Sequence, residues 1–388
     1  MRKTVLLKGP TLSMSGYGQH SRQIFRWLMK KDVDLLVQAT PWGSTSWHIN
    51  EKGLSGLVGE IMKRTVGNLP KRPDVSLQVI LPNEWDINAA NVNVGVSAFV
   101  ETDVCNPKWI EDCNRMSHIV VPSKHIKETI ERTGRVKVPL DVVPEAYIDQ
   151  IRSRNEVTEE PLLDLKTDFN FLILGQLTGN NNNNDRKNTY NTLKWLCEAF
   201  KNDPNVGIVI KTNTGTGTTI DRANTYNALK ACVSSVRKGD YPRVTLLHGA
   251  MEEEEVARLY RHPKIKACIN LTRGEGFGLP LLEAAASDLP VIATNWSGHL
   301  DFMKMGKFIP INYELKEIDR TRVDGSIFVR GARWAEASED DFKKKVKKFK
   351  DNFDMPTKWA QDLGLKLRES HSQENIEKIY DQILGHLL

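Results

Sequence analysis

The sequence contains few cysteines and no long hydrophobic run. Its five cysteines among 388 residues are widely spaced and form no Cys-x-x-Cys pair, which argues against a disulfide framework or a finger-like metal site. No stretch approaches the ~18–20 apolar residues of a membrane span, and the apolar start of the chain is too short for a signal peptide. We therefore expect a cytoplasmic protein without an integral membrane segment.

Neither sign of charge dominates the composition. The formal net charge of +5 would favour an anionic partner but does not by itself indicate nucleic acid. The densest basic stretch, residues 343–350, lies among apolar residues at helical spacing: Phe342, Val346, Phe349 and Phe353. This spacing predicts a helix that buries one stripe and turns its lysines to solvent; the alternative is a contact with an anionic surface.

Short apolar runs alternate with helical or polar stretches along the chain. In the first half, predicted strands cover residues 4–7, 33–37, 75–81, 94–100 and 119–121. Residues 150–168 then turn polar, which is typical of a linker, and the length suits two domains. The alternation predicts an α/β protein with two Rossmann-like, doubly wound parallel sheets and a ligand cleft between the two domains.

The same alternation resumes after the predicted linker. Strands are expected at 169–174, 207–211, 244–247, 267–270 and 291–294, with helices at 189–200, 223–236, 253–260 and 279–286. A helical tail is expected to follow as far as Leu388. The low-complexity tract Asn180–Asn184 is interpreted as the mobile tip of a loop.

The densest chemistry lies in residues 272–284, where a strand leads into a loop with three glycines and a helix follows at once. Glycines let the backbone approach a ligand closely, and the free N–H groups of a helix start favour an anion such as a diphosphate. Glu275 precedes this helix and Glu283 lies about one turn into it. One carboxylate can therefore face a reacting sugar while the other accepts hydrogen bonds from ribose hydroxyls.

The Glu-x7-Glu spacing from Glu275 to Glu283, with the following Leu-Pro-Val-Ile-Ala-Thr-Asn-Trp-Ser-Gly, resembles the donor-site signature of family-4 retaining glycosyltransferases. The resemblance implies the GT-B fold, with two Rossmann-like domains facing a central cleft. It implies an acceptor-side domain over residues 1–160 and a donor-binding domain over 161–365. A C-terminal helix in 366–388 is expected to pack back toward the first domain.

The resemblance also assigns donor-site residues. Arg186 and Lys187 match the paired cations that neutralise the donor diphosphate, although Gln176 stands where many members carry an arginine. With Glu275 they are the expected catalytic residues, together with Glu101 on the acceptor side. The remaining donor-binding candidates are Gly16, Tyr17, Gly18, Lys211, Gly249, Gly276, Phe277, Gly278, Leu279 and Glu283.

On the acceptor side, residues 94–124 are similar to first-domain segments of members that use an acidic residue. Glu101 is the candidate there, Asp103 its alternative, and His20 a further candidate beside the Gly16–Gly18 loop. A carboxylate that only caps a helix, an ordinary turn and a packing histidine are the respective alternatives. The Ser297–Asp301 turn is expected to pack under the donor loop, and Asp288 to take the left-handed conformation of a helix cap.

The resulting expectation is a retaining hexosyltransferase that uses a nucleotide sugar, most simply a UDP-sugar, with no cofactor and no metal. The acceptor is expected to be a glycan or another hydroxyl-bearing molecule. A hydroxymethylated DNA base is the alternative acceptor, since the stretches 42–47 and 118–127 would suit a polyanion. A phosphorylase, an epimerase and an inert nucleotide-sugar binder of the same fold are the alternative functions.

Overall fold

Strands and helices alternate along the computed structural model, which describes residues 2–69, 71–152, 162–179, 181–212 and 214–388. By contacts, the chain divides into two compact units. Unit 1 comprises residues 1–146, 324–332 and 371–388, and unit 2 comprises 147–323 and 333–370. Of the predicted linker 150–168, residues 153–161 lie outside the described residues, and so does the predicted domain boundary at 160/161.

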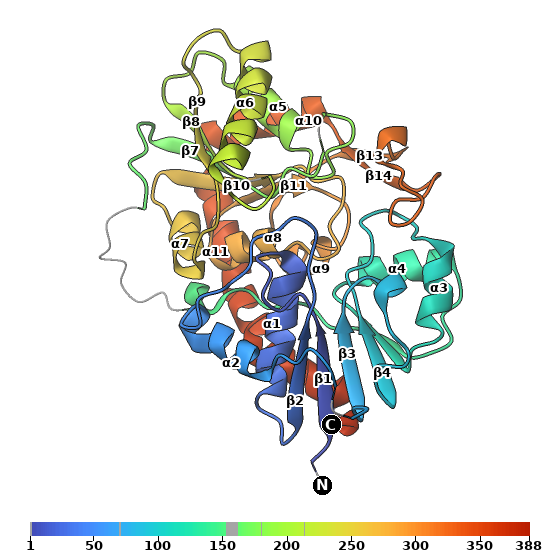
Figure 1. Ribbon diagram of the computed structural model, residues 1–388. Helices are drawn as coiled ribbons and strands as arrows, with labels where there is room; N and C mark the ends of the chain where they lie inside the picture. The colour runs from blue at the N-terminus through green and yellow to red at the C-terminus, as the bar shows by residue number, and fades with distance from the viewer. Residues whose placement is uncertain (1, 70, 153–161, 180, 213) are drawn as a thin grey trace. The chain divides into compact units, whose positions relative to one another are not determined.

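Unit 1 contains a six-stranded parallel sheet with the strand order β2-β1-β3-β4-β5-β6 (Figure 1). The strands are β1 Thr4–Gly9, β2 Asp34–Ala39, β3 Val75–Val79, β4 Val92–Val96, β5 His118–Val121 and β6 Leu140–Val142. The helices are α1 Gly16–Leu28, α2 Leu57–Arg64, α3 Pro107–Cys113, α4 Lys124–Thr133 and α12 Gln373–Leu384.

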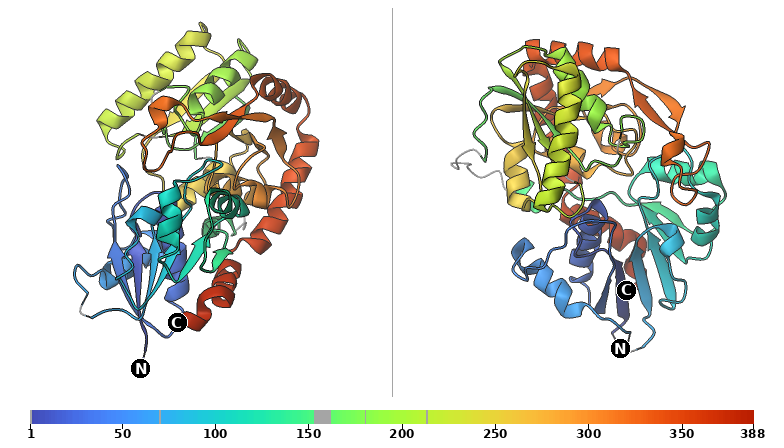
Figure 2. Two further views of the ribbon diagram at one scale, coloured as in Figure 1. Left: turned by 90° about the vertical axis from the view of Figure 1, so that its right-hand side faces the viewer. Right: turned by 45° about the horizontal axis from the view of Figure 1, so that its top comes forward.

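The C-terminal helix α12 packs on α1 within unit 1, and the red C-terminal helix is seen beside the blue sheet in Figure 2. The Trp27 ring stacks on Tyr380 at 5.0 Å, and the indole N–H of Trp27 donates to Asp381 at 2.9 Å. Ile376, Tyr380 and Leu384 thereby join the core of the β1–β4 region. The last part of the chain thus completes the core of the first sheet, because its apolar stripe covers α1.

Unit 2 contains a second six-stranded parallel sheet, with the order β12-β11-β10-β7-β8-β9. The strands are β7 Phe169–Leu174, β8 Val206–Lys211, β9 Arg243–Leu247, β10 Ile265–Asn270, β11 Val291–Thr294 and β12 Ile309–Ile311. The helices are α5 Thr189–Ala199, α6 Thr219–Val236, α7 Glu253–Tyr260, α8 Leu279–Ala286, α9 Leu300–Met303, α10 Glu339–Asp351 and α11 Asp354–Ser370.

Side chains of β7 alternate between the two faces of this sheet. Phe171 and Ile173 join the core beneath α5, α6 and α10, whereas Leu172 joins the core beneath α7, α8 and α11. Figure 1 shows the two helix groups on opposite sides of the strands. The predicted α/β class with two doubly wound parallel sheets is confirmed.

The prediction of a helical tail is wrong for residues 309–337. The chain there forms β12 and an antiparallel hairpin of β13 Tyr313–Glu317 and β14 Arg333–Ala337. Because β13 is exposed along most of its length, its sequence lacks the apolar alternation that marks a half-buried strand. The tail is helical from α10 onward, and Phe342, Val346 and Phe349 of α10 are buried as predicted.

The Asn180–Asn184 tract also differs from the prediction of a mobile loop tip. Asn180 lies outside the described residues, but Asn181–Asn184 form a hydrogen-bonded turn in which the Asn181 side chain accepts from the Asn183 and Asn184 N–H groups. Asn184 is buried and donates to the Thr321 hydroxyl at 3.1 Å. Side-chain-to-backbone bonds of this kind give a polar repeat a fixed turn.

Candidate active site

The candidate site lies where the strand order of the second sheet reverses, between β7 and β10. In this sheet the chain leaves β7 toward β8 on one side, whereas β10 continues to β11 on the other. Loops that follow such neighbouring strands diverge and leave room for a ligand. The loop after β7 supplies Arg186 and Lys187, and the loop after β10 supplies Glu275.

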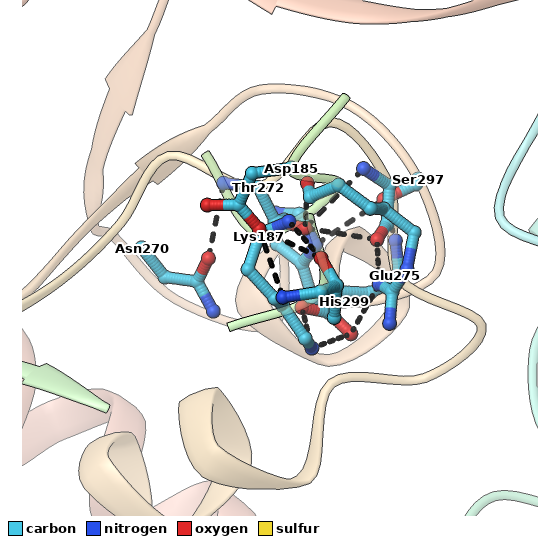
Figure 3. A network of polar contacts seen from close by, with 10 residues as sticks. Asp185, Lys187, Asn270, Thr272, Glu275, Ser297 and His299 are labelled. Atoms are coloured by element: carbon cyan, nitrogen blue, oxygen red, sulfur yellow. Dashed lines mark hydrogen bonds and ion pairs between the residues drawn. The ribbon is translucent and has the colours of Figure 1, made fainter. Parts of the chain in front are cut away.

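A buried ion cluster joins these two loops (Figure 3). The Lys187 ammonium donates to both carboxylate oxygens of Glu275, at 2.6 and 2.8 Å. The Arg186 guanidinium lies 3.7 Å from the same carboxylate and donates to the Gly274 carbonyl at 2.7 Å. All three side chains are at most 15% exposed. Two cations therefore surround one anion, which leaves the cluster suited to a further negative group.

The charge state of Glu275 follows from this cluster. Burial opposes ionisation of the carboxyl, but the Lys187 and Arg186 cations outweigh it and hold the pKa of Glu275 below its usual value. The side chain is thus a carboxylate at neutral pH. A carboxylate can orient a cation or stabilise positive charge on a reacting sugar, but it cannot donate a proton.

The turn after β11 supports the backbone of Glu275, as predicted. The Glu275 N–H donates to the Ser297 hydroxyl at 2.9 Å, and the Gly298 N–H donates to the Glu275 carbonyl at 3.0 Å. A Cβ atom on Gly298 would lie 2.1 Å from the Gly276 carbonyl oxygen, so only glycine fits there. His299 donates from Nε2 to the Thr294 carbonyl at 2.8 Å, and burial lowers the pKa of its imidazole.

Arg273 holds the other side of the site together, a role that motif reasoning missed. It is 2% exposed and its guanidinium donates to the carbonyls of Asp185 and Asn182, at 2.6 and 2.8 Å. It also pairs with Glu336 and lies 5.3 Å above the Trp334 ring. The residue immediately before the glycine loop therefore fixes the loop that carries both site cations. Its contacts are all distant in sequence, so only its charge beside a buried strand could have indicated it.

Asp185 shapes the start of α5. Its carboxylate accepts from the Thr178 N–H and hydroxyl and from the Thr189 N–H, at 3.2, 2.7 and 2.7 Å. Asn188 then adopts a left-handed backbone with φ 55° immediately before the helix. These bonds set the direction in which Arg186 and Lys187 leave the loop. Gln176, which stands in place of the family's arginine, is exposed.

The glycine loop contributes backbone more than side chains. Gly278 has φ +104°, and a Cβ there would also meet His299 at 3.0 Å. Phe277 packs on Phe302 with ring centroids 5.1 Å apart, and Leu279 is buried in the same core, so both side chains pack in the interior of unit 2. Glu283 is 5% exposed on α8.

Two further polar contacts lie in unit 2. The Tyr260 hydroxyl donates to Glu283 at 3.3 Å, and burial raises the pKa of Tyr260 well above its usual value. At the ends of β8 and β9, the Lys211 ammonium donates to the Gly249 carbonyl at 2.5 Å, and burial lowers the pKa of Lys211. Asp288, beyond α8, has φ 62° as predicted for a helix cap.

The predicted acceptor-side residues belong to unit 1. His20 is 2% exposed, and its Nε2 lies 3.1 Å from the Tyr380 hydroxyl, a contact that joins α1 to α12. Burial lowers the pKa of the His20 imidazole to about 4. Gly18 lies against the Ser13 carbonyl, whereas Gly16 has open space around it. Glu101 is half-buried, and the carbonyl of buried Asp103 accepts from Arg132 at 3.0 Å.

Comparison with known proteins places this site in a family context. Residues 235–321, which include Glu275 and Glu283, match the family model described as Glycosyl transferases group 1. None of the curated proteins compared with the chain matches it. Within the described ranges, no helix is both long and apolar enough to cross a bilayer.

Three solved structures resemble the chain along its length. A glycosyltransferase from Rickettsia africae has 12% identity and a TM-score of 0.67, covering 100% of this chain and 98% of that one. HepE from Anabaena, solved with UDP and glucose, has 11% identity and a TM-score of 0.62 over 99% and 100%. Sucrose-phosphate synthase from Thermosynechococcus elongatus has 13% identity and a TM-score of 0.59 over 100% and 99%. The chain therefore has the GT-B glycosyltransferase fold.

Proposed function

We propose that this protein is a glycosyltransferase that moves a hexose from a UDP-sugar to an acceptor hydroxyl, with retention of anomeric configuration and without a metal. The observation that carries the proposal is the buried cluster of Lys187, Arg186 and Glu275 at the strand-order reversal of the second sheet. Such a site meets what cleavage of a sugar–diphosphate bond requires, since it gathers fixed positive charge away from water.

The cations would bind the diphosphate together with the amino end of α8. As the bond between the anomeric carbon and the phosphate oxygen breaks, negative charge grows on the leaving phosphate. Lys187 and Arg186 both lie within 4 Å of the Glu275 carboxylate and are already largely buried. They can therefore stabilise the charge on the leaving phosphate without reorganisation. The new bond forms between the acceptor oxygen and the anomeric carbon, and the acceptor proton passes to the departing phosphate.

Glu275 serves this step as a positioning and electrostatic residue. It holds Lys187 through both carboxylate oxygens and stays ionised, so it also offers negative charge to a sugar ring that becomes cationic in the transition state. Its main chain is fixed by Ser297 and Gly298, which limits drift of the carboxylate.

The nucleoside would extend from the diphosphate along the strand ends of unit 2. Glu283 offers a carboxylate for ribose hydroxyls. In the described structure the Thr212 hydroxyl and Nε2 of His248 are buried without hydrogen-bond partners, next to the Lys211–Gly249 contact. Buried polar atoms of this kind are places where a ligand supplies the missing partner.

The test is donor cleavage by the full chain. Purified protein is incubated with sugar-labelled UDP-, GDP- and ADP-glucose, and the released sugar and nucleotide are separated by chromatography. We expect UDP-glucose to be consumed, and Lys187→Ala to slow this by about 10²–10³-fold. Lys194→Ala, which changes a lysine of α5 whose side chain is 36% exposed, is the control and should match the parent. Inertness toward every donor would leave only a nucleotide-sugar binder.

A further inference from the structure

Residues 40–50, the tryptophan loop, follow β2 in unit 1 and carry two indole rings at the carboxyl edge of the first sheet. Trp42 stacks on Tyr17 with ring centroids 3.9 Å apart and planes 22° from parallel. Trp47 is 38% exposed. Ligands of parallel α/β sheets bind at the carboxyl ends of the strands, so a partly exposed indole at this edge is within reach of one.

The backbone of the tryptophan loop is tied to the loop that follows β1. The Met14 N–H donates to the Ser46 carbonyl and the His48 N–H donates to the Leu12 carbonyl, both at 2.8 Å. The hydroxyls of Ser13 and Thr45 are 2.7 Å apart. The rings are thus presented from a fixed backbone, which lowers the entropy cost of ordering them around a ligand.

The same edge carries a carboxylate. The Tyr17 hydroxyl lies 2.9 Å from the Ser97 hydroxyl and accepts from the Ala98 N–H at 2.9 Å, just beyond β4. Burial raises the pKa of Tyr17, and the negative charges of Glu101 and Glu145 raise it further. The Tyr17–Trp42 pair therefore lies within electrostatic reach of Glu101, the predicted acceptor-side carboxylate.

The tryptophan loop itself carries no charge. Residues 40–50 contain no Asp, Glu, Lys or Arg. Burial, together with the Arg22 cation, lowers the pKa of His48 to about 4, so its imidazole is neutral at pH 7. A phosphate backbone is bound chiefly through cations, and this loop offers none. What it offers are its indole rings, the exposed hydroxyl of Ser44 and the exposed amide of Asn50, whereas the Thr45 hydroxyl already donates to the Trp42 carbonyl.

We propose that the tryptophan loop binds a neutral sugar ring of the acceptor, so that the acceptor is a carbohydrate. The C–H face of a pyranose is apolar and packs on an indole face, while its rim of hydroxyls pairs with neutral donors and acceptors. This identification of the acceptor rests on the proposed transferase function; the binding of sugar by the loop does not.

The experiment measures binding of the labelled full chain to an array of neutral oligosaccharides, sulfated and sialylated oligosaccharides, and a short DNA duplex. We expect neutral oligosaccharides to bind and Trp47→Ala to weaken that binding by about tenfold or more. Trp47→Phe should recover part of the loss because it restores a ring face. Ile49→Ala is the matched control, since Ile49 is 80% exposed in the same loop but has no ring.

Three results would overturn the proposal: no binding to any neutral oligosaccharide, binding to DNA or acidic glycans alone, or unchanged binding by folded Trp47→Ala. UDP-glucose cleavage by the parent protein is measured on the same preparation. Cleavage without saccharide binding refutes the sugar-binding loop and leaves the transferase. Saccharide binding without cleavage of any nucleotide sugar refutes the transferase and leaves the loop.

Discussion

The ammonium of Lys187 lies within 2.8 Å of both carboxylate oxygens of Glu275, although the two residues are 88 positions apart. The pair joins the loops after β7 and β10, which are neighbours in the second sheet. A buried ion pair of this kind contributes little net stability when intact, because desolvation offsets the attraction. This small net contribution to stability agrees with the proposal that the cluster binds a charged ligand.

Glu275→Gln should separate turnover from nucleotide binding. Removing the carboxylate eliminates stabilisation of the developing sugar cation, so UDP-glucose cleavage should fall by about 10²–10³-fold. UDP itself should bind as tightly as before or more tightly, because a negative charge next to the cations is gone. Calorimetric titration and a cleavage assay check the two halves. Equal losses in both would show that Glu275 only holds the fold.

The pH dependence of the same variant has a definite sign. A carboxyl with a lowered folded-state pKa adds stability above its ordinary pKa of 4.5 and loses it as pH falls through the folded value. Parent protein should therefore lose stability relative to Glu275→Gln below about pH 4.5. Urea unfolding at several pH values from neutral to acidic measures the difference. A pH-independent difference would contradict the assigned charge state.

Arg273→Lys should destabilise unit 2 even though the charge is kept. Lysine cannot span the carbonyls of Asp185 and Asn182 and the Glu336 carboxylate at once. We expect a loss of about 3 kcal/mol, and thus a fall in Tm of roughly 2–4 °C per kcal/mol. Arg243→Lys, at an exposed position on β9, should change Tm little. Calorimetry that finds the two variants alike would rule out a structural role for Arg273.

The two glycines of the Gly-Tyr-Gly segment should respond differently to alanine. A Cβ on Gly18 would lie 2.1 Å from the Ser13 carbonyl oxygen, whereas one on Gly16 would meet nothing within 4 Å. Gly18→Ala should cost about 1–3 kcal/mol through overpacking. Gly16→Ala should be neutral or gain up to about 1 kcal/mol, since both residues lie in α1. Denaturant unfolding followed by circular dichroism compares them, and equal effects would contradict the packing.

His20 should make the first unit sensitive to mild acid. Burial lowers its pKa from 6.5 to about 4, and Glu145, 3.9 Å away, does not reverse this. The unfolded state binds the proton first, so stability is complete above pH 6.5 and falls between 6.5 and 4, by about 3 kcal/mol. Burial lowers the pKa of His48 and His371 to about 4 as well, so the effect of His20 is read as a difference between variants.

His20→Gln isolates that contribution. Its stability should change less with pH than that of the parent over this interval, when both are followed by thermal unfolding at fixed ionic strength. The control is His386→Gln, near the C-terminus, which should keep the pH dependence of the parent. A variant that is as pH-sensitive as the parent would mean that His20 does not titrate with unfolding.

Local signals predicted the elements that build the site. The strands 169–174 and 291–294 and the helices 253–260 and 279–286 have the predicted bounds, because glycine, proline or charged residues end each apolar run. The hairpin β13–β14 was not predicted, because its exposed face carries no apolar alternation. Arg273 was missed for a related reason: its carbonyl, carboxylate and ring partners come from segments that only the fold brings together.

The acceptor-side prediction shows the same limit. His20 is a candidate because it lies beside the Gly16–Gly18 loop, with a packing histidine as the alternative; the structure buries it against Tyr380 of α12, a contact across 360 residues of sequence. The stretch 42–47 is expected to suit a polyanion, yet residues 40–50 contain no Asp, Glu, Lys or Arg. Glu101, Asp103 and the donor-side assignments stay predictions that the variants above address.

The central claim is that Lys187 and Arg186 bind the diphosphate of a nucleotide sugar. Isothermal titration of UDP into the parent protein, Arg186→Ala, Lys187→Ala and the control Lys194→Ala tests it most directly. We predict that the two site variants lose about 2 kcal/mol or more of binding free energy, roughly 30-fold in Kd, and that the control binds like the parent. UDP binding of equal affinity by all four folded proteins would contradict the account.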